Sequence, residues 1–179
     1  NQVIGTGTAI DSARLQNMIA QTVNVDPRSV HAYSMGEHGD SQMVPWSTVT
    51  IAGKPFYDVI ADNKELVGDV DLDELVYRTT QEGWEIFNRK GTTYYGIATA
   101  CVGVIKAILN DENRIIPVST LLEGEYGERD VYAGVPTVLN RSGAYDVLEI
   151  HMTPGELARF KESTRVIREY TDRIMKLNL

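Results

Sequence analysis

Residues 115–150, IIPVSTLLEGEYGERDVYAGVPTVLNRSGAYDVLEI, decide the fold class of this chain. They contain three segments, 115–122, 131–139 and 144–150, that are rich in β-branched side chains and separated by turn residues. The residues at 140–143 suit a hairpin connection. Strands joined this closely pair antiparallel, because a parallel pair needs a crossover of a dozen or more residues. The sequence therefore predicts an antiparallel sheet here.

Helical patterns precede these strands. Apolar residues recur every three or four positions over 9–23, with Asp11 in the opening turn, where the helix dipole favours an anion. A second helix is predicted from Asp71, which has a carboxylate three residues later, to about Lys90. Residues 93–109 are apolar nearly all round, which predicts a third helix, buried on most faces at the centre of the core.

The last helix has the clearest start signal in the chain. Thr153 is a good N-cap, Pro154 suits the first helical position, and Glu156 supplies the carboxylate at the third position, so a helix is predicted from there to near Leu179. Helices and strands occur in blocks and do not alternate. The predicted class is therefore α+β, with long helices packed on a mainly antiparallel sheet.

A polar loop at residues 36–41 divides the segment from residue 30 to residue 51. Residues 30–35 and 43–51 are predicted to be strands that flank the loop at 36–41, GEHGDS, and residues 53–55 form the next turn. Two strands that present a glycine-containing polar loop are a common way to place side chains at a site.

Composition narrows the function. The chain has 179 residues, 17 Lys and Arg against 25 Asp and Glu, a formal charge of −8 and one Cys. No cluster of basic residues offers a nucleic-acid surface, one cysteine makes neither an internal disulfide nor a structural zinc site, and no apolar run reaches the ~20 residues of a membrane helix. We expect a cytoplasmic protein with no metal, nucleic-acid or membrane partner. The abrupt apolar start after Asn1 suggests a piece of a longer protein.

Two possible catalytic motifs are incomplete. Gly5 and Gly7 suggest a dinucleotide-binding loop, but the third glycine of that fingerprint falls at Ile10, so a tight turn is favoured. Ser34 is one substitution away from a nucleophile elbow, with His151 as a possible base. That motif needs a helix directly after the serine, and a loop is predicted here, so a strand serine is favoured.

Asp11, Arg14 and His38 are the stronger candidates. Asp11 and Arg14 lie three residues apart on one helix face, which fits either an ordinary ion pair or a guanidinium placed to bind a carboxylate. His38 lies between Gly36 and Gly39 in the polar loop. An imidazole gives and takes protons near neutral pH, and a carboxylate such as Asp11 behind it sets its tautomer. A single histidine in a loop is, however, commonly a solvent-exposed residue without a catalytic role.

These motifs together resemble the C-terminal half of an L-lactate dehydrogenase, of the lactate/malate dehydrogenase family. The resemblance rests on residues 3–8 (VIGTGT) with 11–14 (DSAR), on 36–41 with Trp46 and Ser47, on Lys90, Gly91 and 93–98 (TYYGIA), on 105–117, and on Tyr132, Gly134 and Pro136. It implies that residues 1–179 are the catalytic (substrate) domain and that the NAD-binding Rossmann domain of the family lies outside this chain.

The resemblance also implies roles for five residues. Arg14 would hold the carboxylate of a 2-oxo acid, and His38 would protonate the ketone oxygen as hydride arrives from NADH, acting as the base in the reverse direction. Asp11 would pair with the imidazolium and raise the pKa of His38. Thr93 would contact the substrate near the reacting centre, and Ile97 would lie against the nicotinamide.

The implied protein interconverts pyruvate and L-lactate with NAD, as in glycolysis and fermentation, and forms a homodimer or homotetramer through this domain. The chain alone is expected to have negligible turnover and no strong NADH binding. It would then act at most as an oligomerisation module.

Two departures from the family pattern leave alternatives open. Gly83, within Glu82-Gly83-Trp84, stands where an Ala-Ala pair is usual, so an L-2-hydroxyisocaproate-type or broader L-2-hydroxyacid dehydrogenase is an alternative, with malate dehydrogenase third. His31 matches the histidine of a fructose-bisphosphate site, while Gln16 replaces its arginine. That replacement puts allosteric activation in doubt.

Overall fold

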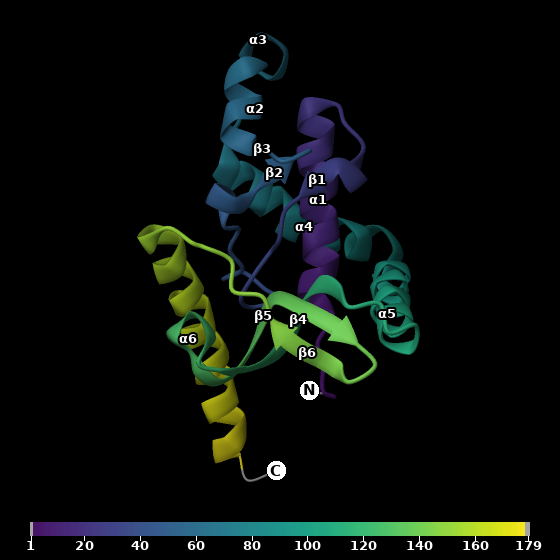
Figure 1. Cartoon of the computed structure of the whole chain (residues 1–179), viewed down its shortest axis with the longest axis vertical. Helices are drawn as coiled ribbons and strands as arrows, with labels where there is room; N and C mark the ends of the chain where they lie inside the picture. Colours follow the sequence, from purple (N-terminus) through teal and green to yellow (C-terminus); the bar gives the residue numbers. More distant parts are fainter. Residues whose placement is uncertain (1, 178–179) are drawn as a thin grey trace.

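Helix α1 (Gly7–Val23) runs through the middle of the molecule and contacts both sheets and two other helices. The computed structural model describes residues 2–177. Figure 1 shows α1 running from beside the small sheet down to the larger one, with α5 and α6 on opposite sides of the larger sheet. The other elements are, in order, η1 (Pro27–Ser29), β1 (Val30–His31), η2 (Trp46–Thr48), β2 (Thr50–Ile51), β3 (Lys54–Pro55), α2 (Phe56–Asp62), α3 (Lys64–Val67), α4 (Leu72–Lys90), α5 (Tyr94–Leu109), β4 (Arg114–Glu123), η3 (Glu125–Gly127), β5 (Arg129–Asn140), β6 (Gly143–Val147) and α6 (Pro154–Lys176).

The larger sheet is antiparallel in the order β4-β5-β6, as the sequence predicted. Strand β6 ends at Val147, three residues before the predicted end at Ile150. Val147 pairs with Thr137. The residue of β5 that lies beyond this pair is Pro136, which has no N–H to donate. The ladder therefore closes with one bond from Leu148 N to Pro136 O.

The small sheet corrects the prediction of two long strands at 30–35 and 43–51. Only β1, β2 and β3 form a ladder, and the predicted turn at 53–55 is shorter because Lys54 and Pro55 belong to β3. Between β1 and β2 the chain makes isolated bridges, Met35 with Met43 and Gly36 with Gly134 of β5. Pro45 lacks a donor, and the 3₁₀ turn η2 follows it, so the ladder cannot continue there.

The helix starts are partly as predicted. Asp71 caps α4 by accepting from the N–H groups of Asp73 and Glu74, and Thr153 with Glu156 forms the full capping box of α6. Helices α2 and α3 were not predicted. The predicted extension of α6 to Leu179 lies partly outside the described residues.

Helix α5 is not the buried core helix that its composition predicted. Only Val104 and Ala107 are buried, where they pack against Val118, Leu139 and Ala144 of the larger sheet. The exposed apolar side chains of this helix are Tyr94, Tyr95, Ile97, Val102, Ile105 and Leu109. Apolar composition indicates which faces a helix tends to bury, but burial also needs a neighbouring element, and within the described residues only one face of α5 has one.

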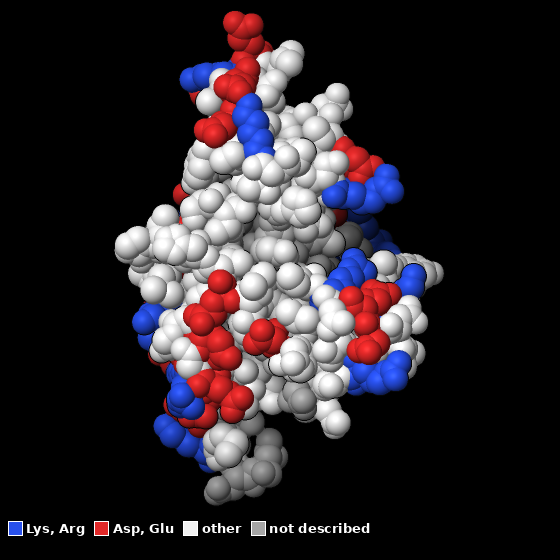
Figure 2. Space-filling view, viewed as in Figure 1, with Lys and Arg blue, Asp and Glu red and all other residues white. Residues whose placement is uncertain are grey.

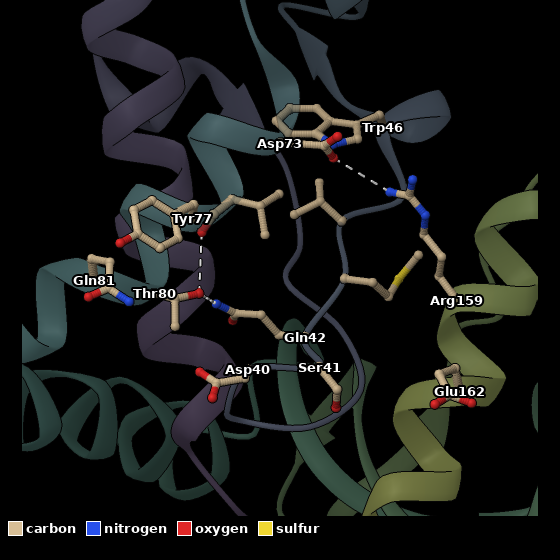
Figure 3. Close-up of a pocket in the computed structure, with 13 residues that line it drawn as sticks. Asp40, Ser41, Gln42, Trp46, Asp73, Tyr77, Thr80, Gln81, Arg159 and Glu162 are labelled. Atoms are coloured by element: carbon tan, nitrogen blue, oxygen red, sulfur yellow. Dashed lines mark hydrogen bonds and ion pairs between the residues drawn. The ribbon is translucent and has the colours of Figure 1, made fainter.

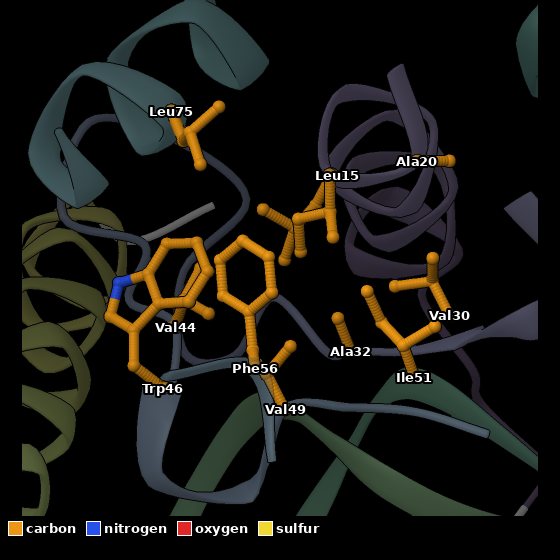
Figure 4. Packing of buried hydrophobic residues seen from close by; sticks show 11 residues of the cluster. Leu15, Ala20, Val30, Ala32, Val44, Trp46, Val49, Ile51, Phe56 and Leu75 are labelled. Atoms are coloured by element: carbon orange, nitrogen blue, oxygen red, sulfur yellow. The ribbon is translucent and has the colours of Figure 1, made fainter. Parts of the chain in front are cut away.

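The largest cluster of buried apolar residues among residues 2–177 lies between α1, the small sheet and the helices α2 and α4. Figure 4 shows Trp46 and Phe56 side by side at its centre, with Leu15 and Leu75 above them. The two rings are stacked, with centroids 5.7 Å apart. This packing holds α1 and α4 together, and the candidate site lies between these two helices.

Replacing Phe56 with alanine is expected to lower the free energy of unfolding by about 3–5 kcal/mol, the usual cost of deleting a buried phenylalanine. Phe56 is 1% exposed, so the cavity left behind cannot fill with water at little cost. Tyr57→Ala is the matched control because Tyr57 is 51% exposed, and it should shift stability by about 0.5 kcal/mol or less. Urea unfolding followed by circular dichroism measures both, and equal losses would contradict this description of the core.

Candidate active site

His38 and Asp11 meet although 27 residues separate them in the sequence. The Nδ1 atom of His38 lies 2.6 Å from Oδ2 of Asp11. An ionised carboxylate only accepts hydrogen bonds, so Nδ1 carries the proton and donates it. The other ring nitrogen, Nε2, is then the one free to give or take a proton.

Asp11 also accepts a bond from Arg14. The Nη1 atom of Arg14 lies 3.3 Å from Oδ1 of Asp11. The side chains of Asp11 and Arg14 are 3% and 14% exposed, whereas that of His38 is 54% exposed. A buried carboxylate with two positively charged or polar neighbours therefore orients a more exposed imidazole. Because α1 begins at Gly7, Asp11 lies in its second turn and not in the opening turn that was predicted.

The Asp11 hydrogen bond raises the pKa of His38. Partial burial and the positive charge of Arg14 lower the pKa, and the negative charges of Asp11 and Glu37 raise it; the net direction is upward. His38 is therefore protonated to a higher pH than an isolated histidine. An imidazolium beside a guanidinium suits the binding and protonation of an anionic carbonyl compound.

Gly7 lets the imidazole of His38 reach this position. A Cβ atom on Gly7 would lie 2.3 Å from Cγ of His38 and 2.4 Å from its Cδ2. The ring therefore packs directly on the backbone of the first residue of α1. Gly5, the other glycine of the opening stretch, pairs with Ser119 of β4 in a two-bond bridge. These glycines serve close packing, which agrees with rejecting the dinucleotide fingerprint.

A cavity of about 590 Å³ opens in front of these side chains. It lies between α1, the loop at 36–41, α4 and the start of α5. Thr93 and Ile97 both line it, so the structure brings together the five residues to which the resemblance gives roles. The other lining residues are Ile10, Glu37, Gly39, Asp40, Gln42, Thr80, Gly83, Trp84 and Phe87.

Gly83 faces Arg14 across this cavity. A Cβ atom at position 83 would lie 3.1 Å from Nη1 and 3.4 Å from Nη2 of Arg14. Even one methyl group would thus crowd the guanidinium, so glycine at this position lets Arg14 lie directly against α4. This geometry supports the importance that the sequence analysis gave to Gly83.

A second cavity of about 640 Å³ adjoins the first and is lined by the loop, α4 and α6. The two cavities share Asp40, Gln42 and Thr80. Figure 3 shows Gln42 pointing at Thr80, with which it is hydrogen-bonded, and Asp73 facing Arg159 at the opposite side. The oxygen of the Gln42 amide accepts from Ser34 at 2.7 Å, so both ends of the amide are held. Gln42 and Thr80 therefore form a wall between the cavities.

The hydrogen bond to Gln42 also shows whether Ser34 can be a catalytic nucleophile. Ser34 is 1% exposed and its hydroxyl points into the protein, while His151 is exposed and makes no hydrogen bond with it. The structure thus brings no base to this serine. It is a buried structural residue, and the hydrolase interpretation is wrong.

Gln16 and His31 lie elsewhere, in a groove of about 870 Å³ along α1, α4 and α5. Gln16 donates from its amide to the carbonyl oxygen of Ala32 at 3.0 Å. Arg28, Lys90 and Arg114 also line this groove. Positive side chains are therefore present, but the amide of Gln16 is already used within the chain.

The sequence analysis missed the residues that complete the cavity wall. Thr80 and Phe87 lie on the same face of α4 as Gly83, at spacings of three and four residues, and that spacing was a usable signal. Gln42 and the contact of Gly7 with His38 had no local signal. Each depends on how α1, α4 and the loop pack together.

Charge is unevenly distributed over the surface. On the face shown in Figure 2, acidic side chains gather at the lower left, where Figure 1 places α6, and basic side chains are scattered among acidic ones.

Among residues 2–177 no group of three or more potential ligands is placed to hold a metal ion. None of the helices in that range is both long and apolar enough to span a membrane.

This fold and cavity agree with the family to which the sequence points. Residues 8–177 match the family model described as lactate/malate dehydrogenase, alpha/beta C-terminal domain. The chain therefore belongs to the lactate/malate dehydrogenase family, and the predicted fold class is confirmed. The chain spans about half the length of the curated relatives it matches.

Those relatives are L-lactate dehydrogenases. The chain is 50% identical to L-lactate dehydrogenase 3 of Bacillus cereus, covering 95% of this chain and 54% of that protein. It is 45% identical to L-lactate dehydrogenase 1 of Bifidobacterium longum, covering 97% and 55%. The crystal structure of the minor L-lactate dehydrogenase from Enterococcus mundtii, in its ligands-bound form, superposes with a TM-score of 0.90 at 40% identity, covering 96% and 55%.

Proposed function

We propose that this chain is the catalytic (substrate) domain of an NAD-dependent L-lactate dehydrogenase that interconverts pyruvate and L-lactate. The observation that carries this proposal is the arrangement of Asp11, Arg14 and His38 around one cavity. It provides a site for a carboxylate beside a proton donor. The names of the relatives support the choice of 2-oxo acid reduction over other reactions of such a site.

The residues divide the work of the reaction. Arg14 pairs with the carboxylate of the 2-oxo acid, ideally through two parallel hydrogen bonds. His38 donates the Nε2 proton to the ketone oxygen, which thereby becomes the hydroxyl group of lactate, and it takes the proton back in lactate oxidation. Asp11 stabilises the imidazolium and fixes the Nδ1–H tautomer. Thr93 contacts the substrate near the reacting carbon.

The cavity also fits a nicotinamide. Ile97 is 44% exposed and presents an apolar surface beside the His38 pocket, as a planar ring requires. A bound NADH supplies the hydride that adds to the keto carbon. We propose that the residues that hold the rest of the cofactor belong to a Rossmann domain outside residues 1–179, as the twofold greater length of the relatives supports.

The other proposals concern the whole protein. We expect it to work in the cytoplasm, in glycolysis or fermentation, as a homodimer or homotetramer that associates through this domain. The neutral Gln16 amide, bonded to Ala32, argues against activation by fructose bisphosphate. The 179-residue chain alone would be an oligomerisation module without turnover.

A second candidate function follows from Gly83. Gly83 lines the cavity and has no side chain of its own, so a branched 2-oxo acid is the alternative substrate, as in an L-2-hydroxyisocaproate-type dehydrogenase. A hydrophobic pocket discriminates by only about 1–3 kcal/mol per methylene, so this position alone decides no more than roughly 10- to 200-fold in specificity.

Steady-state NADH oxidation by the full-length protein tests both candidates. We expect kcat/KM to be higher for pyruvate than for 4-methyl-2-oxopentanoate, by about 10-fold or more. A higher kcat/KM for the branched acid would mean that this acid, and not pyruvate, is the substrate. The proposed roles of Arg14 and His38 would remain intact. The 179-residue chain, assayed beside it, should be inactive; enzyme-like turnover there would overturn the proposed division into two domains.

A further inference from the structure

Ser163 of α6 reaches the loop that carries His38, 125 positions earlier in the sequence. Its side chain is fully buried, with 0% exposure. Its Oγ accepts a hydrogen bond of 2.8 Å from the backbone N–H of Glu37, the residue directly before His38. The hydroxyl of α6 is therefore bonded to the backbone next to the proposed proton donor.

The hydroxyl of Ser163 is also part of a closed ring of hydrogen bonds. Its Oγ lies 3.1 Å from Oγ of Ser41, and Ser41 donates to the carboxylate of Glu37 through both its hydroxyl and its backbone N–H. Each hydroxyl has one hydrogen, and that of Ser41 goes to Glu37, so Ser163 donates to Ser41. The ring starts at the N–H of Glu37 and returns to its carboxylate, and it joins both ends of the loop.

Close packing adds a second constraint at the same point. Gly36 has φ = +87°, a conformation that favours glycine, and a Cβ atom there would lie 2.3 Å from Oγ of Ser163. Gly36 also exchanges both backbone bonds with Gly134 of β5. The start of the loop is therefore clamped between β5 and α6, with Ser163 touching it directly.

We propose that Ser163 is a positioning residue for His38: its hydroxyl closes the ring that holds the loop at 36–41 in the conformation that brings Nδ1 onto Asp11. This inference rests on the proposed role of His38 as proton donor. Ser163 does not line the substrate cavity, so it acts through the loop and not on the substrate.

The expected effect follows from the charges around His38. Asp11 and Arg14 approach it from α1, and Glu37 and Asp40 lie beside it in the loop. Without the Ser163 hydroxyl, the partly buried N–H of Glu37 loses its acceptor, and the loop shifts to satisfy it. The bond from His38 to Asp11 then lengthens, and the pKa of His38 falls towards its ordinary value.

The test uses Ser163→Ala in the full-length enzyme, with Thr164→Val as the matched control. Thr164 is the next residue of α6, is 1% exposed, and bonds only within its helix, to the carbonyl oxygen of Lys161. We expect Ser163→Ala to lower kcat/KM for pyruvate about 10- to 100-fold. We also expect it to lower the pKa of His38 towards that of an isolated histidine. The control should change neither.

The pKa is measured without turnover, from the pH dependence of diethyl pyrocarbonate modification at His38, read by mass spectrometry. A loss of activity in Ser163→Ala with an unchanged His38 pKa would overturn the positioning role. An altered pKa in an enzyme whose His38→Asn variant remains active would instead overturn the proposed catalytic role of His38. Should Ser163→Ala not fold, Ser41→Ala breaks the same ring at a half-buried position and should shift the pKa in the same direction; no shift there would overturn the proposal.

Discussion

His38→Asn is expected to lower kcat/KM for pyruvate by about 1000-fold, within the range that a general acid contributes. Asparagine keeps a polar group of similar reach, but its amide is not acidic and cannot transfer a proton to the substrate. The ketone oxygen would then take its proton from water. Arg14 is untouched in this variant, so KM should change much less than kcat. Stopped-flow and steady-state NADH oxidation measure these quantities.

The pH dependence gives this prediction a second readout. Reduction needs the imidazolium, so in the parent enzyme kcat/KM for pyruvate falls as pH rises through the pKa of His38, which the Asp11 hydrogen bond raises. In His38→Asn this decline should disappear. The same shift stabilises the folded state: its contribution is fully present below the unfolded pKa of histidine and is lost as pH rises through the raised folded pKa.

His31→Asn is the control for His38→Asn. His31 is also a histidine, but it is exposed and lies in the groove formed by α1, α4 and α5. Its replacement should leave both kcat/KM and the pH profile near those of the parent. Activity that survives in His38→Asn would contradict the proposed mechanism, whatever the substrate preference.

Gly7→Ala is expected to lower kcat/KM for pyruvate by about 100-fold, because a shift of about 1 Å at a reacting group has effects of this size. The new methyl group would lie 2.3 Å from Cγ of His38. The imidazole must therefore turn away, and its bond of 2.6 Å to Asp11 is lost. We expect the pKa of His38 to fall in this variant as well.

Stability should change little in Gly7→Ala, because His38 is partly exposed and alanine is the better helix former at the start of α1. Gly155→Ala is the matched control: it also lies in the first turn of a helix, α6, and a Cβ atom there meets nothing within 4 Å. Activity assays and thermal unfolding of both variants check the prediction. Parent-like activity in Gly7→Ala would show that the imidazole does not need this close approach.

The sequence predicted most elements because their signals are local. Periodic apolar residues and the capping residues Asp71 and Thr153 located α1, α4 and α6, and β-branched segments located the larger sheet. The errors arose where neighbours decide. Pro45 and the turn after it interrupt the strand predicted at 43–51, and α5 is exposed on faces that its composition predicted to be buried.

The candidate site shows the same division. Local spacing put Asp11 and Arg14 on one helix face and His38 between two glycines, and the resemblance to a known family joined them. Neither the local spacing nor the family resemblance indicated the second cavity behind Gln42 and Thr80, because these two wall residues are 38 positions apart in the sequence.

The sequence by itself therefore determined the class of fold, the positions of the long helices and of the larger sheet, and the residue types that carry the proposed chemistry. Only the tertiary structure decided that His38 packs on Gly7 and that Ser163 of α6 bonds to the loop that carries His38. The reason is physical: helix and strand signals come from neighbours within a few residues, whereas these contacts depend on how α1, α6 and the loop pack against one another.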